Sequence, residues 1–304
     1  MTTRSATMPF PARLRTELKF DPVLLTIVAA LLFGGFVILA SASISISDNA
    51  VGNPFFYVQR QLLAAAIGLA AAGVCLFIPM QVWQSLSLLM LFAGLALLVL
   101  VLVPGVGHEV NGSTRWVRFG VMNLQVSEPA RLCFLLYLGG YLVRRNKMLR
   151  ERFMGFFWPM LVLTVASGLL LMQPDFGAAV VLVATALVML FVAGARIRDF
   201  AIFLLLTVGS LAALAVLSPY RLKRLTGFLD PWSDPFDSGF QLTQSLIAIG
   251  RGEWFGVGLG DSVQKLFYLP EAHTDFVFAV FAEEFGLFGS LLLIGLFLAL
   301  LWRV

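Results

Sequence analysis

Charged residues are scarce in this sequence. Only 12% of its 304 residues are Asp, Glu, Lys or Arg, while 60% are hydrophobic. A soluble domain carries about 25% charged residues. The composition therefore excludes an ordinary soluble domain and indicates a membrane protein, and we expect no nucleic-acid partner.

Cysteine and histidine are also rare, with two of each in the chain. Cys75 and Cys133 both fall inside apolar runs. Cysteines in such runs usually serve as small packing residues rather than as a disulfide or a metal site. We expect no protein-held metal centre from these residues.

Long apolar runs fill most of the remaining sequence. A run of about 18 or more apolar residues is long enough for a helix to cross the hydrocarbon core. The pattern predicts an all-α, polytopic membrane helix bundle of one domain (1–304) with about eight transmembrane helices. The predicted spans are 22–45, 58–79, 85–104, 128–143, 157–172, 177–194, 200–218 and 276–300.

The basic residues predict how these spans are oriented. "RRNKMLRER" (144–152) and "ARIR" (195–198) are short basic connections, which mark the cytoplasmic side. The N-terminal segment 1–21 is also basic and precedes a run too long for a signal peptide, so we expect it to be cytoplasmic and retained. The opposite face then holds 105–127, "QPDFG" (173–177) and a large extracytoplasmic loop, 219–275.

Nine of the 21 basic residues lie outside the predicted cytoplasmic regions, which is more than the positive-inside bias favours. They include Arg115, Arg131, Arg224 and Lys265. One interpretation is that they are solvated or anchor the protein at lipid headgroups. The other is that they handle an anionic ligand such as a phosphate-bearing lipid.

The predicted loop 219–275 holds seven of the 17 acidic residues, yet it is rich in Phe, Trp, Leu and Gly. That composition argues against disorder. "FQLTQSLIAIG" (240–250) is too short to span a membrane and favours a re-entrant or interfacial helix with Gln241, Gln244 and Ser245 on a polar face. The glycine-rich "GRGEWFGVGLG" (250–260) would allow the backbone to approach a ligand closely, although glycine also serves plain turns.

"PEAHTDF" (270–276) gathers Glu271, His273 and Asp275 next to the last apolar run. In a helix, Glu271 and Asp275 would share a face. Three interpretations remain open from spacing alone. Thr274 or Asp275 caps the following helix, Asp275 acts as a general base, or the three groups hold a divalent cation.

Two further pairs of charged residues lie inside predicted spans. Glu128 and Arg131 are three positions apart, so they should meet on one helical face. Glu283 and Glu284 lie deeper, where ionisable groups usually face a bundle interior or a cavity. An ion-pair network and a functional cavity are both compatible with this placement.

Three stretches together resemble the FtsW/RodA (SEDS) family: "VNGSTRWVRFGVMNLQVSEPARL" (110–132), "QPDFGAA" (173–179), and the run from "FLDPWSDPFDSG" to "PEAHTDFVFAVFAEEFG" (228–286). "GVGLGDSVQKLFYLPEAHTDF" is similar to the division-specific branch. The resemblance implies a peptidoglycan glycosyltransferase that polymerises lipid II, with its active site on the outer face of the inner membrane. It implies that Asp275 is the essential acid, and that Arg115, Trp116, Ser127, Glu128 and Arg131 match family motifs.

The sequence departs from the family pattern in three places. Arg131 stands where the family usually has lysine, and Val126 where it usually has proline. Family members usually have ten spans, whereas the eighth predicted span ends this sequence, so we expect a C-terminal truncation.

We therefore predict septal lipid II polymerisation with Asp275 as general base in an inverting transfer. The alternatives are a lipid II flippase and a non-catalytic division scaffold. This predicted mechanism requires no cofactor, although Mg²⁺ or Mn²⁺ could stabilise the charge of the leaving pyrophosphate. The implied partners are a class B penicillin-binding transpeptidase and other division proteins. The predicted substrate contacts are Arg115, Trp116, Glu128, Arg131, Arg224, Gln244, Lys265, Glu271 and His273.

Overall fold

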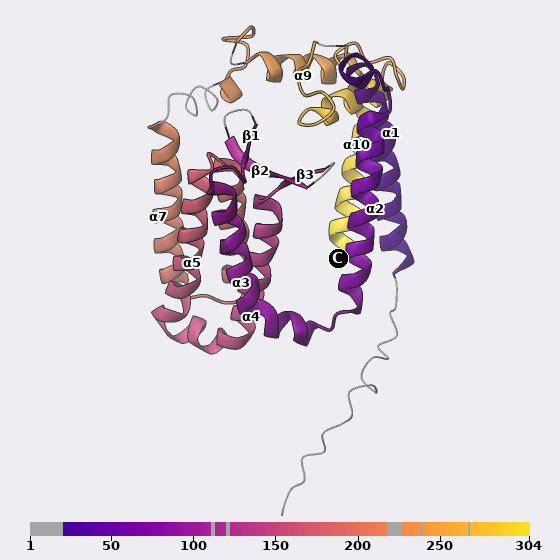
Figure 1. Cartoon of the computed structure of the whole chain (residues 1–304). Helices are drawn as coiled ribbons and strands as arrows, with labels where there is room; N and C mark the ends of the chain where they lie inside the picture. The colour runs from indigo at the N-terminus through magenta and orange to yellow at the C-terminus, as the bar shows by residue number, and fades with distance from the viewer. Residues whose placement is uncertain (1–20, 111–112, 120–121, 218–226, 238, 267) are drawn as a thin grey trace, which may run out of the picture. The chain divides into compact units, whose positions relative to one another are not determined.

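A computed structural model describes residues 21–304 apart from 111–112, 120–121, 218–226, 238 and 267. The chain forms two compact units (Figure 1). Unit 1 combines residues 1–69 with 223–304, and unit 2 comprises residues 70–222. The boundary falls within helix α2 (Phe56–Phe77). The predicted cytoplasmic segment 1–21 lies outside the described residues except for Asp21.

Five helices lie wholly within the described part of unit 2. They are α3 (Met80–Leu102), α4 (Ser127–Glu151), α5 (Phe153–Met172), α6 (Phe176–Val192) and α7 (Ile197–Val216). A core of buried apolar side chains, with Phe134 and Phe156 among the largest, joins α3 to α6.

Helices α3 and α4 pack closely because small residues lie at their interface. A Cβ atom at Gly140 would lie 2.5 Å from the Cβ of Ser87, and one at Gly94 would lie 3.2 Å from the Cβ of Cys133. Small residues let helix backbones approach in a membrane, where water does not drive helices together. Cys133 thus has the packing role that the sequence predicts, and both cysteines are free thiols.

A three-stranded antiparallel sheet connects α3 to α4, and the sequence analysis did not predict it. Its strands are β1 (His108–Val110), β2 (Ser113–Phe119) and β3 (Met122–Gln125), in the order β1-β2-β3. The register pairs Trp116 with His108 on one side and with Gln125 on the other. The sheet leads directly into α4, because the backbone N–H of Val126 donates to the carbonyl of Arg115.

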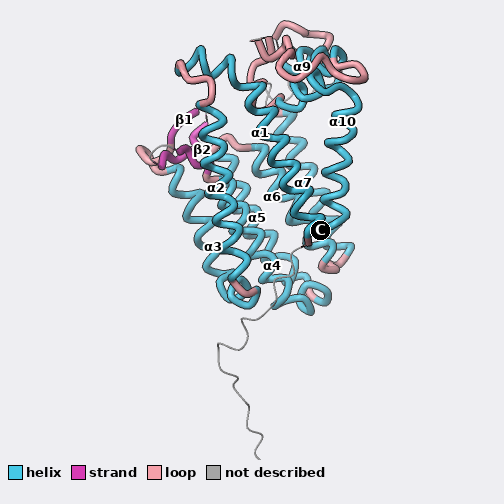
Figure 2. The backbone as a smooth tube through the Cα atoms, turned by 90° about the vertical axis from the view of Figure 1, so that its right-hand side faces the viewer, coloured by secondary structure: helices cyan, strands magenta, loops and turns pink. Residues whose placement is uncertain are grey.

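Unit 1 contains α1 (Pro22–Val51), α9 (Phe240–Arg251) and α10 (Val277–Arg303), together with the first part of α2. Helix α1 begins with residues typical of a helix N-terminus: the Asp21 side chain accepts from the N–H groups of Val23 and Leu24, and Pro22 occupies the first turn. Helix α1 packs along α10, and α9 packs on α10 near its first turns (Figure 2). Ala248, Ala279 and Val280 are buried where α9 meets α10.

Each of the eight predicted spans corresponds to a helix of the structure. Six of these helices, α1, α2, α3, α5, α7 and α10, are long and apolar enough to cross a membrane, and α6 is a shorter apolar helix of 17 residues. The prediction of a polytopic helical membrane protein is therefore confirmed. That the two units act as one domain stays a prediction.

Helix α10 is interrupted at Gly286, whose φ is +66°. In an unbroken helix, the N–H groups of Leu287 and Phe288 would donate to the carbonyls of Glu283 and Glu284. Here they donate instead to the carbonyls of Glu253 and Trp254. The two glutamate carbonyls accept from Val257 (2.9 Å) and Gly258 (3.1 Å). Segment 253–258 thus replaces the hydrogen bonds that the interruption removes.

This insertion explains the glycine-rich stretch. A Cβ atom at Gly252 would lie 2.0 Å from the carbonyl oxygen of Ala282, and one at Gly256 would lie 2.1 Å from that of Glu284. Gly252 and Gly256 thus let the backbone approach helix α10, and approach of residues 250–260 to a ligand stays a prediction.

Candidate functional site

Asp275 lies in the turn that leads into α10, and its side chain is exposed. It forms no hydrogen bond or ion pair with any residue that the structure describes. The N-cap of α10 is Phe276, and no side chain caps this helix end. The capping interpretation of Thr274 and Asp275 was therefore wrong, and the Asp275 carboxylate remains available to a substrate.

The turn that carries Asp275 is held by Glu271 rather than by a helix. Glu271 has a φ of +55°, and its carbonyl accepts from the N–H groups of Thr274 (3.1 Å) and Phe276 (3.2 Å). Its carboxylate also accepts from the Thr274 hydroxyl at 2.7 Å. Residues 270–276 are turn residues. Glu271 and Asp275 are therefore not the helical pair that their spacing suggested.

His273 contacts neither Glu271 nor Asp275 in the interactions described here, but packs on an aromatic ring. Its ring contacts that of Tyr57 on α2, with centroids 4.6 Å apart. Within the described part of the chain, no three His, Cys, Asp or Glu side chains are grouped as metal ligands. Glu271 is bonded to Thr274 and His273 lies on an aromatic ring, so their contact with substrate stays a prediction.

Two other predicted contacts of unit 1 are less accessible. Lys265 is 5% exposed, and its ammonium group lies 2.7 Å from Glu284. Its charge is already neutralised, which favours a structural role over binding a phosphate. Gln244 is half-buried on α9, and its neighbour Ser245 is buried, donating to the carbonyl of Leu242. The predicted polar face of this helix is thus partly turned into the protein.

Unit 2 contains a second polar group, centred on Arg115 of β2. Its guanidinium lies 3.6 Å from Asp175, whose side chain is only 5% exposed. Asp175 also caps α6 by accepting from the N–H of Ala178 at 3.1 Å. The preceding Gln173 is buried and donates to the carbonyl of Leu98. Asp175, which lies within the "QPDFG" motif, was not among the predicted site residues, and its contact with Arg115 is what brings it into this polar group.

The first turn of α4 adds another ion pair to this unit. Arg131 donates to the carboxylate of Glu128, which confirms that the two share a helical face. Arg131 keeps 31% of its side chain exposed, and Arg115 keeps 32%. Both guanidiniums are therefore held by an acid while remaining accessible. Such an arrangement can orient a donor toward a phosphate.

Trp116 follows Arg115 on β2 and is half-buried. Its cross-strand neighbour His108 lies 3.1 Å from a nitrogen of Arg118. The predicted contact Arg224 lies outside the described residues. Asp275, Gln244, Lys265, Glu271 and His273 belong to unit 1, and Arg115, Trp116, Glu128 and Arg131 to unit 2. That these two groups form one site stays a prediction.

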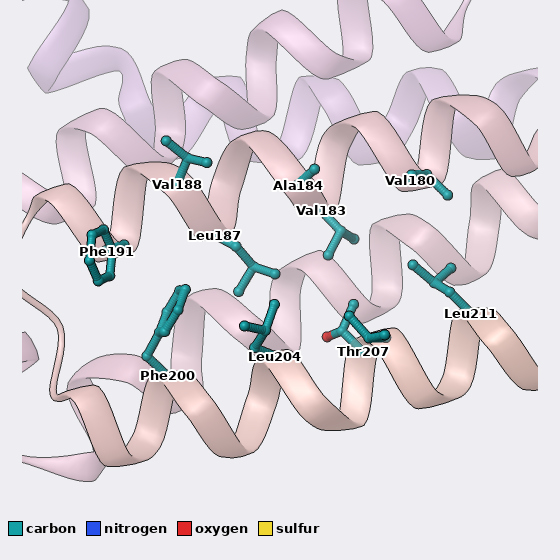
Figure 3. Close-up of a pocket in the computed structure, with 11 residues that line it drawn as sticks. Val180, Val183, Ala184, Leu187, Val188, Phe191, Phe200, Leu204, Thr207 and Leu211 are labelled. Carbon is teal, nitrogen blue, oxygen red and sulfur yellow. The ribbon is translucent and has the colours of Figure 1, made fainter.

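A cavity of about 510 Å³ between α6 and α7 has different chemistry (Figure 3). Its walls are aliphatic and aromatic side chains such as Leu187, Phe200 and Leu204, and Thr207 supplies the polar atom visible there. The described residues that line it include no carboxylate or imidazole that could accept a proton.

Comparison with known proteins identifies what the chain is similar to. Residues 22–304 match the family model of the FtsW, RodA and SpoVE cell cycle proteins. The chain is 55% identical over 301 residues to a protein of Thioalkalivibrio sulfidiphilus, covering 99% of this chain and 75% of that protein. It is 53% identical over 291 residues to one of Halorhodospira halophila, covering 96% and 74%. Both are named probable peptidoglycan glycosyltransferase FtsW.

Solved structures agree with the family match. The rod shape determining protein RodA of Thermus thermophilus is 30% identical, with a TM-score of 0.63 over 94% of this chain and 74% of that one. A chain from a peptidoglycan synthase complex is 32% identical, with a TM-score of 0.69 over 94% and 77%.

Proposed function

This chain belongs to the FtsW/RodA/SpoVE family, and from that premise we propose that it is a peptidoglycan glycosyltransferase. It polymerises lipid II into glycan strands during septal cell-wall synthesis. The observation that carries this proposal is the identity of over 50% to proteins named for that activity, along nearly the whole chain. The exposed carboxylate of Asp275 supplies the chemistry.

The reaction needs a base because a sugar hydroxyl is a weak nucleophile at neutral pH. A bond forms between the C4 oxygen of one lipid-linked disaccharide and the anomeric carbon of another. The bond from that carbon to the polyprenyl pyrophosphate breaks, and the hydroxyl proton passes to a carboxylate. Inversion at the anomeric carbon requires one base on the face opposite the leaving group. We assign this role to Asp275, from which the proton can pass to water.

The leaving pyrophosphate takes up negative charge as the bond breaks. Arg115 and Arg131 are suited to stabilise it, because each is accessible and oriented by a neighbouring carboxylate. Among the described residues no cluster of His, Cys, Asp or Glu suits a protein-held divalent cation.

The cellular setting is part of the same proposal. We place the protein in the inner membrane at the septum, with a cytoplasmic N-terminus and the 219–275 segment outside. The basic connections 144–152 and 195–198 support this orientation. Its partners are a class B penicillin-binding transpeptidase and other division proteins, in line with the structural likeness to a chain of a peptidoglycan synthase complex.

The experiment reconstitutes the purified chain in vesicles supplied with lipid II, beside the Thioalkalivibrio sulfidiphilus relative as a positive control. We expect glycan strands resolved by gel electrophoresis in both preparations. Movement of lipid II across the bilayer without any glycan product, while the relative polymerises, would contradict the proposal and favour a flippase.

A further inference from the structure

Two adjacent glutamates of α10 are among the most deeply buried charged residues of the described chain. Glu283 is 0% exposed and Glu284 is 1% exposed. A buried carboxylate is costly unless it is paired and hydrogen-bonded. The partners of these two residues therefore indicate what each one holds in place.

Glu283 fixes the backbone of the segment that precedes α10. Its carboxylate accepts from the N–H groups of Val263 (3.1 Å) and Gln264 (3.4 Å) and from the hydroxyl of Ser262. Arg251, at the end of α9, lies 3.8 Å from the same carboxylate. Glu283 thus joins α10 to residues 262–264 through two main-chain N–H groups and one hydroxyl.

Glu284 makes the second connection through side chains. One of its oxygens lies 2.7 Å from the Lys265 ammonium group and 2.6 Å from the hydroxyl of Ser41 on α1. The ammonium group also donates to that hydroxyl at 2.8 Å. We call Ser41, Lys265 and Glu284 the buried triad. It ties α1, α10 and the preceding segment together at one point.

In the sequence, Asp275 lies between Lys265 and Glu284, the two residues that the ion pair joins. It follows Lys265 by ten positions and precedes Glu284 by nine. Between Lys265 and Asp275, Leu269 and Ala272 are buried, and the N–H of Leu269 donates to the carbonyl of Gln264. Because the Asp275 carboxylate has no partner of its own among the described residues, the backbone of this closed loop sets its position.

We propose that the buried triad is a positioning device, which holds the turn 270–276 so that Asp275 meets the attacking hydroxyl. The inference rests on the proposed role of Asp275. The triad residues do not touch the reacting atoms. Lys265 acts through Glu284 and the backbone, and this role replaces the pyrophosphate contact that its charge suggested.

The test compares steady-state polymerisation of lipid II by wild type, the double variant Lys265→Met/Glu284→Gln, and Ser41→Ala. The double variant leaves no uncompensated buried charge, so it should fold. We expect its kcat to fall about 100-fold, the scale of a small displacement of a catalytic group, with KM within about twofold of wild type, as positioning implies. Ser41→Ala keeps the ion pair and should lower kcat about tenfold.

Hydrogen exchange supplies the readout of position. We expect faster exchange at residues 266–276 in the double variant, with an unchanged exchange rate in α4. A matched control is Asp21→Asn, which removes the exposed ion pair of Asp21 with Arg303 that also links the start of α1 to α10. This variant should keep wild-type kcat and wild-type exchange at 266–276.

Wild-type kcat in the double variant would overturn the inference, as would a raised KM with unchanged kcat, which would make Lys265 a substrate contact. If the double variant fails to fold, Ser41→Ala alone tests the positioning role. A wild-type kcat in Ser41→Ala would also overturn that role. Asp275→Asn runs in the same assay. Its activity would refute the proposed base itself, whereas its inactivity beside a fully active double variant would refute only the positioning role.

Discussion

The carboxylate of Glu284 lies 2.7 Å from the ammonium group of Lys265, and both side chains are buried. The two residues are 19 positions apart, and the turn that carries Asp275 lies between them. An ion pair in this environment stabilises little relative to a well-packed apolar pair, but losing one partner leaves a buried charge. We therefore infer that the ion pair serves to position the backbone rather than to raise the free energy of unfolding.

Gly140 and Gly139 provide a matched pair on α4. A Cβ atom at Gly140 would lie 2.5 Å from the Cβ of Ser87, whereas one at Gly139 would have nothing within 4 Å. We expect Gly140→Ala to lower the free energy of unfolding by about 1–3 kcal/mol through overpacking. Gly139→Ala should leave it unchanged or raise it by up to about 1 kcal/mol. Thermal unfolding midpoints in detergent measure both, and equal midpoints would contradict the described α3–α4 contact.

The break in α10 predicts a second glycine effect. At Gly286 the φ is +66°, and a Cβ atom would lie 2.3 Å from the backbone nitrogen of Gly256. We expect Gly286→Ala to destabilise by about 2 kcal/mol or more, through backbone strain and the clash. Gly295→Ala, on the same helix with open space around it, should be tolerated. The rate of hydrogen exchange at 253–258 should rise only in the Gly286 variant. An unchanged rate in that variant would contradict the hydrogen bonds between segment 253–258 and α10.

Asp175 combines two roles that substitution can separate. It caps α6 and pairs with Arg115. Asparagine caps helices about as well as aspartate, so Asp175→Asn should preserve the cap, while Asp175→Ala should lose about 1 kcal/mol of stability. Both variants release Arg115, and we expect both to raise the KM for lipid II. An unchanged KM in both would show that Asp175 does not orient a substrate contact.

The sequence predicted the helices well because the apolar runs are long enough to be read by length alone. It missed strands β1 to β3, which are short, and β1 has only three residues. The triad was also beyond sequence reasoning, since Ser41 is 243 positions from Glu284 and only the fold brings them together. The contact of Gly252 and Gly256 with α10 could not be predicted, because close approach to a ligand and close approach to a helix require the same residue.

For the "PEAHTDF" stretch, spacing left cap, base and metal site open. The cap fails because Phe276 occupies that position without a side-chain bond. The helical pairing of Glu271 with Asp275 fails because Glu271 adopts a positive φ that ends any helix there. The side chain of Asp275 is exposed, and its role as the general base stays a prediction.

The most direct measurement of the central claim compares lipid II polymerisation and lipid II binding by wild type, Asp275→Asn and Asp261→Asn. Asp261 is an exposed aspartate of the same segment and serves as the matched control. If Asp275 is the general base, Asp275→Asn binds lipid II normally while its polymerisation rate falls about 100-fold or more, and Asp261→Asn behaves as wild type. Near-normal polymerisation by Asp275→Asn would contradict the account.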